Sequence, residues 1–289
     1  MSGENKLVGD MSFELAGANA PDDLPCRYGA SKLMCRGPRR TLDKPYVAFL
    51  GGSETYGKYV SQPFVALAEP DLGIDCVNLG SVNAGLDAFV QDPDILGIAQ
   101  SARLTVIQIL GAQNLSNRLY RVHPRRNDRF LAASTMLSTI YRDVDFTEFH
   151  FNKHLLGTLK MLSAERFSIV QEELQQAWLN RMRLLISALN GRAVLLWLRY
   201  DEDGGSNSGL GPEPFLVGQE MLDMLRPEVI GVTEIRVAPA GKTGELADMR
   251  FGPMQAPAAE HLIGPAAHRD IAIQLQSVIR PEINQKARR

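Results

Sequence analysis

The chain has 289 residues, a net charge of −2, 45% apolar residues and 22% charged residues. This composition is that of a globular protein, and it excludes a disordered chain and a strongly basic one. The three cysteines, Cys26, Cys35 and Cys76, are an odd number without paired spacing, which argues against a disulfide framework or a zinc site. No apolar run reaches about 18 residues, and the polar first 23 residues lack the apolar core of a signal peptide. We therefore expect a cytoplasmic protein with no membrane span, no metal and no cofactor.

The first predicted element along the chain is an N-terminal arm, residues 1–44, which is rich in Gly, Pro and Asp. Five short apolar runs follow, rich in β-branched and aromatic residues. None of them alternates strictly between apolar and polar residues, which is typical of strands buried on both faces of a parallel sheet. The five predicted strands are 46–50, 74–79, 104–110, 193–198 and 229–237.

Helices are predicted between these strands, at 60–69, 92–101, 164–189 and 265–279. The clearest is 164–189, where large apolar residues recur at three- and four-residue steps and form one face. Ser163 is its candidate N-cap, and Asn190-Gly191 should stop it. Pro281 is expected to end the last helix.

The alternation of strands and helices predicts a three-layer, doubly wound α/β domain over residues 45–289, with about five parallel strands. Residues 114–163 contain no strand for this sheet, so we expect a helical insertion that caps the strand ends. Residues 202–214 are polar and glycine-rich, which indicates a flexible loop.

Small and polar residues follow three of the predicted strands directly, at 51–53, 80–83 and 111–114. Ligands of open parallel sheets bind at the carboxyl ends of the strands. Glycine allows backbone N–H groups to face a ligand and amide side chains add donors, a combination that builds an oxyanion hole. Ser53, in the first of these turns, is therefore the candidate nucleophile.

The same turns carry a family resemblance. FLGGSETYG resembles the first block of SGNH (GDSL-type) hydrolases, Gly-Asp-Ser-x-x-x-Gly: Gly51, Ser53 and Gly57 match, and Gly52 stands in place of Asp. NLGSVNAG and ILGAQN resemble the second and third blocks. The chain is also similar to a bacterial SGNH-like family of unassigned reaction that shares the segments GGSETYG and HPRRNDRFL.

The resemblance implies that Ser53 attacks a carbonyl carbon and that His261 or His268 accepts its proton. The family's Asp, three residues before the histidine, is replaced here by Ala258. The resemblance also implies an oxyanion hole built from the backbone N–H groups of Ser53 and Gly80 with the side chain of Gln113 or Asn114.

A basic segment, residues 117–129, follows the third predicted strand. Arginine forks match carboxylate, sulfate and phosphate groups, so this segment predicts an anionic substrate such as an acidic carbohydrate or a phosphorylated carrier. A solvated loop, or an oligomer contact with the acidic stretch 143–148, is the alternative interpretation. Nucleic acid is not favoured, because acidic residues balance the rest of the chain. The candidate substrate-binding residues are Lys58, Asn83, Arg118, Arg121, Arg125 and Arg126.

Residues 52–58 also match the phosphate-loop pattern G-x-x-x-x-G-K, although Tyr59 stands where Ser or Thr would reach magnesium. Three functions therefore remain open. The first is a serine-dependent esterase, deacylase or acyltransferase acting on an anionic substrate. The second is a transferase or binding protein that holds sulfate, phosphate or a nucleotide on the Gly52–Lys58 turn. The third is a catalytically silent SGNH-like interaction module, and a homo-oligomer is compatible with each.

Overall fold

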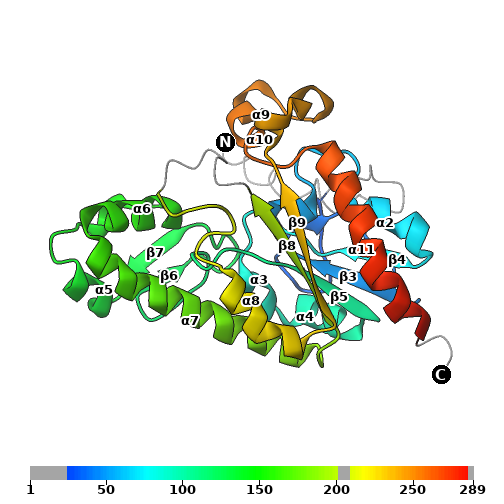
Figure 1. Ribbon diagram of the computed structural model, residues 1–289, viewed down its shortest axis with the longest axis horizontal. Coiled ribbons are helices and arrows are strands. Elements are labelled where there is room, and N and C mark those ends of the chain that lie inside the picture. The colour runs from blue at the N-terminus through cyan, green and yellow to red at the C-terminus, as the bar shows by residue number, and fades with distance from the viewer. Residues whose placement is uncertain (1–24, 201–208, 286–289) are drawn as a thin grey trace, which may run out of the picture.

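The computed structural model describes residues 25–200 and 209–285. Its centre is a five-stranded, all-parallel sheet with the order β4-β3-β5-β8-β9 (Figure 1). The predicted parallel sheet is confirmed. Its strands are β3 (Tyr46–Leu50), β4 (Asp75–Asn78), β5 (Leu104–Gln108), β8 (Ala193–Tyr200) and β9 (Gly231–Val237).

Helices cover both faces of this sheet, which confirms the three-layer architecture (Figure 1). Along β3, Tyr46, Ala48 and Leu50 face one apolar core, while Val47 and Phe49 face the other. The first core is closed by α3 (Leu86–Val90), α4 (Pro93–Ser101), α7 (Ala164–Ala188) and α8 (Gln219–Leu225). The second is closed by α2 (Phe64–Leu72) and α11 (Pro265–Gln285).

The strand order reverses at β3. The chain passes from β3 to β4 on one side, and then crosses back to place β5 on the other side of β3. In doubly wound sheets such a reversal opens a crevice outside the carboxyl ends of the two strands, where ligands bind. Ser53 follows β3 directly and begins the short helix α1 (Ser53–Tyr56), so it lies at this point of the sheet.

The described part of the N-terminal arm packs against the turn that carries Ser53. It forms two short antiparallel strands, β1 (Pro25–Cys26) and β2 (Cys35–Arg36). The buried guanidinium of Arg36 donates to the carbonyl of Gly57 at 2.9 Å and to that of Val60 at 3.1 Å. Residues 1–24 of the predicted arm lie outside the described residues.

The insertion, residues 114–163, contributes no strand to the central sheet, as predicted. It is not purely helical, because β6 (Tyr120–Val122) and β7 (Phe130–Ala133) form an antiparallel pair. Tyr120 and Val122 are buried while Arg121 between them is exposed, a period-two pattern concealed within the basic segment. The remaining elements of the insertion are α5 (Thr135–Ile140), the 3₁₀ turn η1 (Phe146–Glu148) and α6 (Asn152–Leu162).

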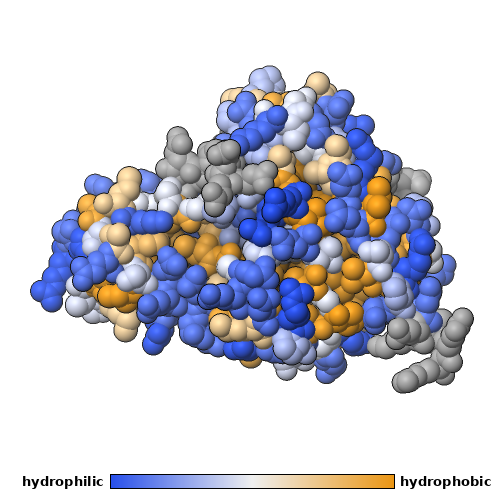
Figure 2. Space-filling model, in the orientation of Figure 1, coloured by the Kyte–Doolittle hydropathy of each residue, from blue (hydrophilic) through white to orange (hydrophobic). Residues whose placement is uncertain are grey.

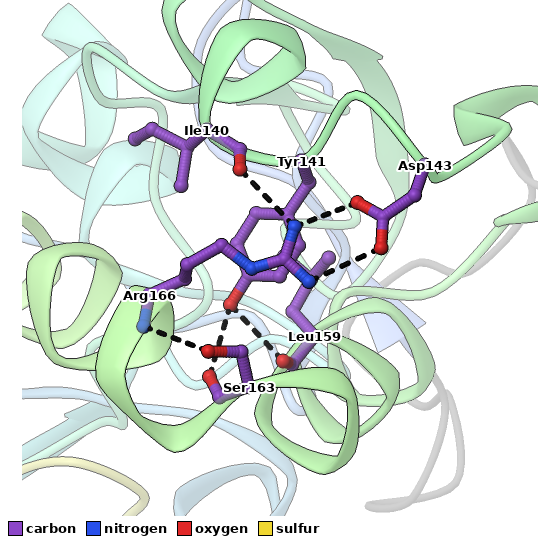
Figure 3. Close-up of polar contacts among 6 residues, drawn as sticks. All are labelled: Ile140, Tyr141, Asp143, Leu159, Ser163 and Arg166. Atoms are coloured by element: carbon purple, nitrogen blue, oxygen red, sulfur yellow. Dashed lines mark hydrogen bonds and ion pairs between the residues drawn. The ribbon is translucent and has the colours of Figure 1, made fainter.

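A network of polar contacts joins the insertion to α7 (Figure 3). The Oγ of Ser163 accepts the backbone N–H of Arg166 at 3.1 Å, so the predicted N-cap is confirmed. The Arg166 guanidinium donates to both carboxylate oxygens of Asp143, at 2.6 and 3.1 Å, and lies 4.3 Å from the ring centroid of Tyr141. Asp143, in the acidic stretch, therefore pairs with α7 rather than with the basic segment.

Two helix ends test the sequence prediction. Asn190 and Gly191 adopt positive φ angles of 53° and 68° just after α7, which confirms the predicted stop. The prediction that Pro281 ends the last helix is wrong, because α11 continues to Gln285. Ile279 and Ile283 pack against the core under α11, and this burial offsets the hydrogen bond that proline removes.

A small lobe follows β9 and precedes α11. Its elements are α9 (Ala240–Thr243), η3 (Glu245–Asp248), η4 (Pro253–Gln255) and α10 (Ala256–Ala259). The lobe packs on the loop after α1, since the N–H of Arg250 donates to the carbonyl of Tyr59 at 2.8 Å and the rings of Tyr59 and Phe251 meet edge to face. Elsewhere in the chain, α8 runs into the 3₁₀ turn η2 (Arg226–Glu228). Of the predicted loop 202–214, residues 202–208 lie outside the described residues.

The surface mixes polar and apolar areas. On the face shown in Figure 2, apolar atoms reach the surface over the insertion and again beside α11, with hydrophilic residues between them. None of the described helices is long and apolar enough to cross a membrane. Exposed large apolar residues of the insertion are Leu131, Met136, Phe151, Met161 and Leu162.

Candidate active site

The turn after β3 is held by a side chain from the neighbouring strand. Gln108 is the last residue of β5 and is buried. Its Oε1 accepts the backbone N–H of Gly52 at 3.0 Å, the N–H of Thr55 at 3.3 Å and the hydroxyl of Thr55 at 2.6 Å. Its Nε2 donates to Glu54 at 2.8 Å. One amide therefore fixes the conformation in which Ser53 is presented.

Two glycines are required by close contacts around this turn. A Cβ on Gly51 would lie 2.0 Å from the Oγ1 of Thr55 and 2.5 Å from the Oε1 of Gln108. A Cβ on Gly80 would lie 2.4 Å from the backbone nitrogen of Tyr56. The motif glycines thus allow the turns after β3 and β4 to pack directly on each other.

The N–H of Gly80 is occupied within its own turn, because it donates to the Oδ1 of Asn78 at 2.9 Å. Gly80 does not line the Ser53 pocket. The resemblance assigned this N–H to the oxyanion, and the structure instead uses it to brace the turn. The neighbouring donor that does reach Ser53 is the backbone N–H of Asn83, which lies 3.4 Å from its Oγ.

Ser53 lines a pocket of about 230 Å³ at the carboxyl ends of β3, β5 and β8. Of the predicted site residues, the pocket also contains Asn83, Gln113, Asn114 and His261. Sequence reasoning missed its acidic and phenolic groups, which are Glu54, Asp128, Tyr200 and Glu213.

Asn83 connects Ser53 to the insertion. It adopts a left-handed φ of 59°, a conformation that asparagine tolerates better than most residues. Its Nδ2 donates to the Oδ2 of Asp128 at 3.2 Å. The Oδ1 of Asp128 is buried and finds no partner among the described residues, and burial raises the pKa of this carboxyl.

The two amide candidates differ in what they offer the pocket. The Oδ1 of Asn114 accepts from the Nδ2 of Asn152 at 3.1 Å, which leaves the Nδ2 of Asn114 as a donor. The Oε1 of Gln113 is buried without a partner in the described chain. The contact with Asn152 fixes the orientation of the Asn114 amide, so we take Asn114 as the candidate oxyanion donor. The N–H of Ser53, at the start of α1, also has no acceptor among the described residues.

The structure separates the two candidate histidines. His261 lies in the exposed loop after α10 and lines the Ser53 pocket. His268 lies in α11 and is only 1% exposed. Its Nδ1 accepts the N–H of Phe64 at 3.1 Å, its ring stacks on Phe64, and burial lowers its pKa to about 3. His268 is thus a structural residue away from the pocket, and neither ring is hydrogen-bonded to Ser53 in the described structure.

The pocket has further acidic groups besides Asp128. The hydroxyl of Tyr200, at the end of β8, donates to the Oε1 of Glu54 at 3.2 Å. Burial, reinforced by the charge of Glu54 and opposed by Lys153, raises the pKa of Glu213 to about 7. Glu213 therefore holds or releases a proton near neutral pH. Among the described residues, no group of three His, Cys, Asp or Glu side chains is arranged as metal ligands would be.

A second pocket, of about 810 Å³, contains most of the predicted anion-binding residues. It is lined by Lys58, Asn83, Arg125 and Arg126, and Asn83 lines the Ser53 pocket as well. Two of the predicted arginines lie elsewhere. Arg118 pairs with Glu173 of α7, and Arg121 projects from β6 outside both pockets.

The comparison with known families covers nearly the whole chain. Residues 11–283 match the family described as a domain of unknown function (DUF6473). The chain belongs to this family. No curated protein matches the chain.

One solved structure, "BT4096 a gut microbial diltiazem-metabolizing enzyme", matches at 13% sequence identity with a TM-score of 0.42. The match covers 81% of this chain and 46% of that one, so the chain spans less than half the length of its neighbour. At this level of similarity the match assigns no reaction to the DUF6473 chain.

The missed residues had a weak signal in the sequence. Gln108 is the single polar side chain near the end of an apolar strand, and Asn78 holds the corresponding place in β4. A polar side chain buried at a strand end must find a partner, and both find it in the turn that carries Ser53. Glu54 is adjacent to Ser53. Asp128, Tyr200 and Glu213 had no such signal, since only the fold places them in the pocket.

Proposed function

We propose that this chain is a serine-dependent esterase, deacylase or acyltransferase that acts on an anionic substrate, with an acidic carbohydrate as one such class. One observation carries the proposal: Ser53 lies at the strand-order reversal, in a polar pocket that also contains His261. The resemblance to SGNH hydrolases is part of the proposal and supplies the roles. The fold provides the position that such a nucleophile needs.

The proposed reaction has two acyl-transfer steps. The Oγ of Ser53 attacks the acyl carbon of an ester, and its proton passes to His261. The oxyanion then accepts hydrogen bonds from the N–H of Ser53 and the amide of Asn114. The C–O bond of the ester breaks, and the leaving alcohol takes the proton from His261. Water or an acceptor hydroxyl releases the acyl group from Ser53 by the reverse sequence.

His261 must approach Ser53 for this chemistry, because no hydrogen bond joins the two in the described structure. His261 is exposed and lies between α10 and α11. The carboxylate that Ala258 fails to supply has candidates in the pocket, namely Glu54, Asp128 and Glu213. Any of these could orient the imidazole if the loop closed over the substrate.

The phosphate-loop alternative receives less support from the structure. The N–H groups of Gly52 and Thr55 already donate to Gln108, so they are not free to bind a phosphate. α1 is only four residues long and ends at Tyr56. Lys58 lines the second pocket and not the pocket of Ser53. The silent-module alternative is decided by the experiment below.

The test uses a serine-directed fluorophosphonate and small acyl esters such as 4-nitrophenyl acetate. We expect wild-type protein to be labelled, and Ser53→Ala to lose both labelling and turnover. Ser61→Ala, a change at an exposed serine, is the matched control and should behave as wild type. His261→Ala should slow labelling strongly, and His150→Ala, at another exposed histidine, should not. Absence of labelling between about pH 6 and pH 9 would support the silent-module alternative instead.

A further inference from the structure

The second pocket is lined by cationic side chains from three separate parts of the chain. Arg27 and Lys32 come from the described part of the N-terminal arm, and Lys58 follows α1. Arg125, Arg126 and Arg129 come from the loop between β6 and β7 of the insertion. Residues far apart in the sequence are thus brought to one cavity of about 810 Å³. We call it the basic pocket.

The cationic side chains of the basic pocket are not ion-paired within the described chain, although the nearby carboxyl of Asp128 interacts with the charges of Arg126 and Arg129. No Asp or Glu lines it, and none of its six cationic side chains forms an ion pair with a described carboxylate. Their contacts are instead with sulfur and aromatic rings: Arg27 with the Sδ of Met34 at 2.9 Å, Lys58 over Tyr59, and Arg129 over Phe151. By contrast, Arg118 of the basic segment and Arg166 of α7 each pair with an acid.

Six like charges around one cavity repel one another, so an anion that enters it gains attraction from all of them. A phosphate or sulfate group offers several oxygens to guanidinium forks and ammonium groups at once, whereas a carboxylate offers two. His123 helps to shape the rim, because its Nδ1 accepts the backbone N–H groups of Arg125 and Arg126 at 3.3 and 3.1 Å. The number of donors therefore favours phosphate or sulfate.

The basic pocket adjoins the Ser53 pocket through Asn83. This residue lines both, and its N–H reaches the Oγ of Ser53 at 3.4 Å. We propose that the basic pocket binds a phosphate or sulfate group of the substrate whose ester bond is cleaved at Ser53. The link to ester cleavage at Ser53 rests on the proposed function, whereas the binding of phosphate or sulfate in the basic pocket does not.

The first experiment measures anion binding by calorimetry, with inorganic pyrophosphate and sulfate as probes and sodium chloride at equal ionic strength as the reference. We expect binding to wild type, and a loss of at least about tenfold in the double variant Arg125→Ala/Arg126→Ala, since each charge-assisted hydrogen bond contributes about that much. Arg121→Ala is the matched control, because it removes an arginine of the same segment outside the pocket. No binding beyond the chloride reference, or equal loss in both variants, would overturn the proposal.

The second experiment tests the link to Ser53 by comparing the acetyl ester of glycerol 3-phosphate with that of glycerol. The phosphorylated ester should have a KM lower by about tenfold, and the double variant should remove this advantage while turnover of the neutral ester persists. Equal KM values for the two esters would overturn the link. If wild type and Ser53→Ala bind pyrophosphate equally but wild type turns over neither ester, the proposed function fails, and so does the link between the basic pocket and Ser53. Phosphate or sulfate binding in the basic pocket would then be the part of the proposal that holds.

Discussion

The backbone N–H of Asn83 lies 3.4 Å from the Oγ of Ser53, across the ends of β4 and β3. The side chain of Asn83 donates to Asp128 of the insertion. Asn83, which has a left-handed backbone and lines both pockets, thus joins the candidate nucleophile to a carboxyl of the Ser53 pocket. The site is built where the sheet, the insertion and the N-terminal arm meet.

The two glycines before Ser53 should respond differently to substitution. Gly51→Ala places a methyl group 2.0 Å from Thr55 and 2.5 Å from Gln108, so it should lower the free energy of unfolding by about 2 to 4 kcal/mol. At Gly52, φ is −85° and the nearest atom to an added Cβ is the flexible Cδ2 of Leu110 at 3.2 Å. Gly52→Ala should therefore change stability by less than about 1 kcal/mol. Urea unfolding measures both, and similar losses in the two variants would contradict the described turn.

His268 should control stability at acidic pH rather than activity. Its pKa falls from 6.5 to about 3 on folding, so the folded protein binds fewer protons in this range. The stability it contributes is complete above about pH 6.5 and is lost as the pH falls toward 3. His268→Asn keeps an acceptor for the N–H of Phe64 but removes this titration, so its unfolding free energy should fall less steeply with acid than that of wild type.

The readout for His268 is the slope of stability against pH between about 6.5 and 4, compared for wild type and His268→Asn. Labelling of Ser53, measured at neutral pH where both proteins are folded, serves as the control and should be unchanged. Parallel slopes would show that His268 is not held neutral by burial. A loss of Ser53 labelling in the folded His268→Asn variant would indicate that His268 takes part in the reaction at Ser53.

Glu213 should give the free energy of unfolding the opposite pH dependence to that given by His268. Its pKa rises from 4.5 to about 7 on folding, so the folded protein retains a proton that the unfolded chain releases. The associated stability is present below about pH 4.5 and is lost as the pH rises through about 7. Glu213→Gln mimics the protonated form, and at pH 8 it should be more stable than wild type by about 1 to 3 kcal/mol.

Thermal or urea unfolding at pH 5 and pH 8 tests the Glu213 prediction, with the exposed Glu220→Gln as the matched control. The two proteins should converge at pH 5, where Glu213 is protonated in wild type. A variant that is less stable than wild type at pH 8 would indicate that the ionised carboxylate has a favourable partner, contrary to the described pocket.

The central sheet could be predicted from the sequence because its strands are local features. The run around Phe49 is apolar at every position, and burial on both faces follows from that alone. The N-cap at Ser163 and the stop at Asn190 depend on neighbours a few residues away, so they were also predictable. Pro281 misled the prediction because the packing of Ile283 is a tertiary effect.

The candidate site could be predicted only in part. Its turns are marked by glycines, so Ser53 and Asn83 were found from the sequence. The partners of those turns were not, because Gln108 and Asp128 approach them only after the strands align. The basic segment looked like one cluster, yet Arg118 turns to α7 while Arg126 enters the basic pocket. Arg118 precedes β6 and Arg126 lies in the loop between β6 and β7, so only the folded strand pair separates the directions of these two side chains.

The sequence by itself determined the α/β architecture and the position of Ser53 at a strand end. Both depend on burial patterns and turn residues that lie close together in the chain. What only the tertiary structure decided is which distant groups share a cavity with it. His261 enters the pocket and His268 does not, although only seven positions separate them. His261 lies in the loop after α10, whereas His268 lies on a face of α11 that packs against Phe64 of α2.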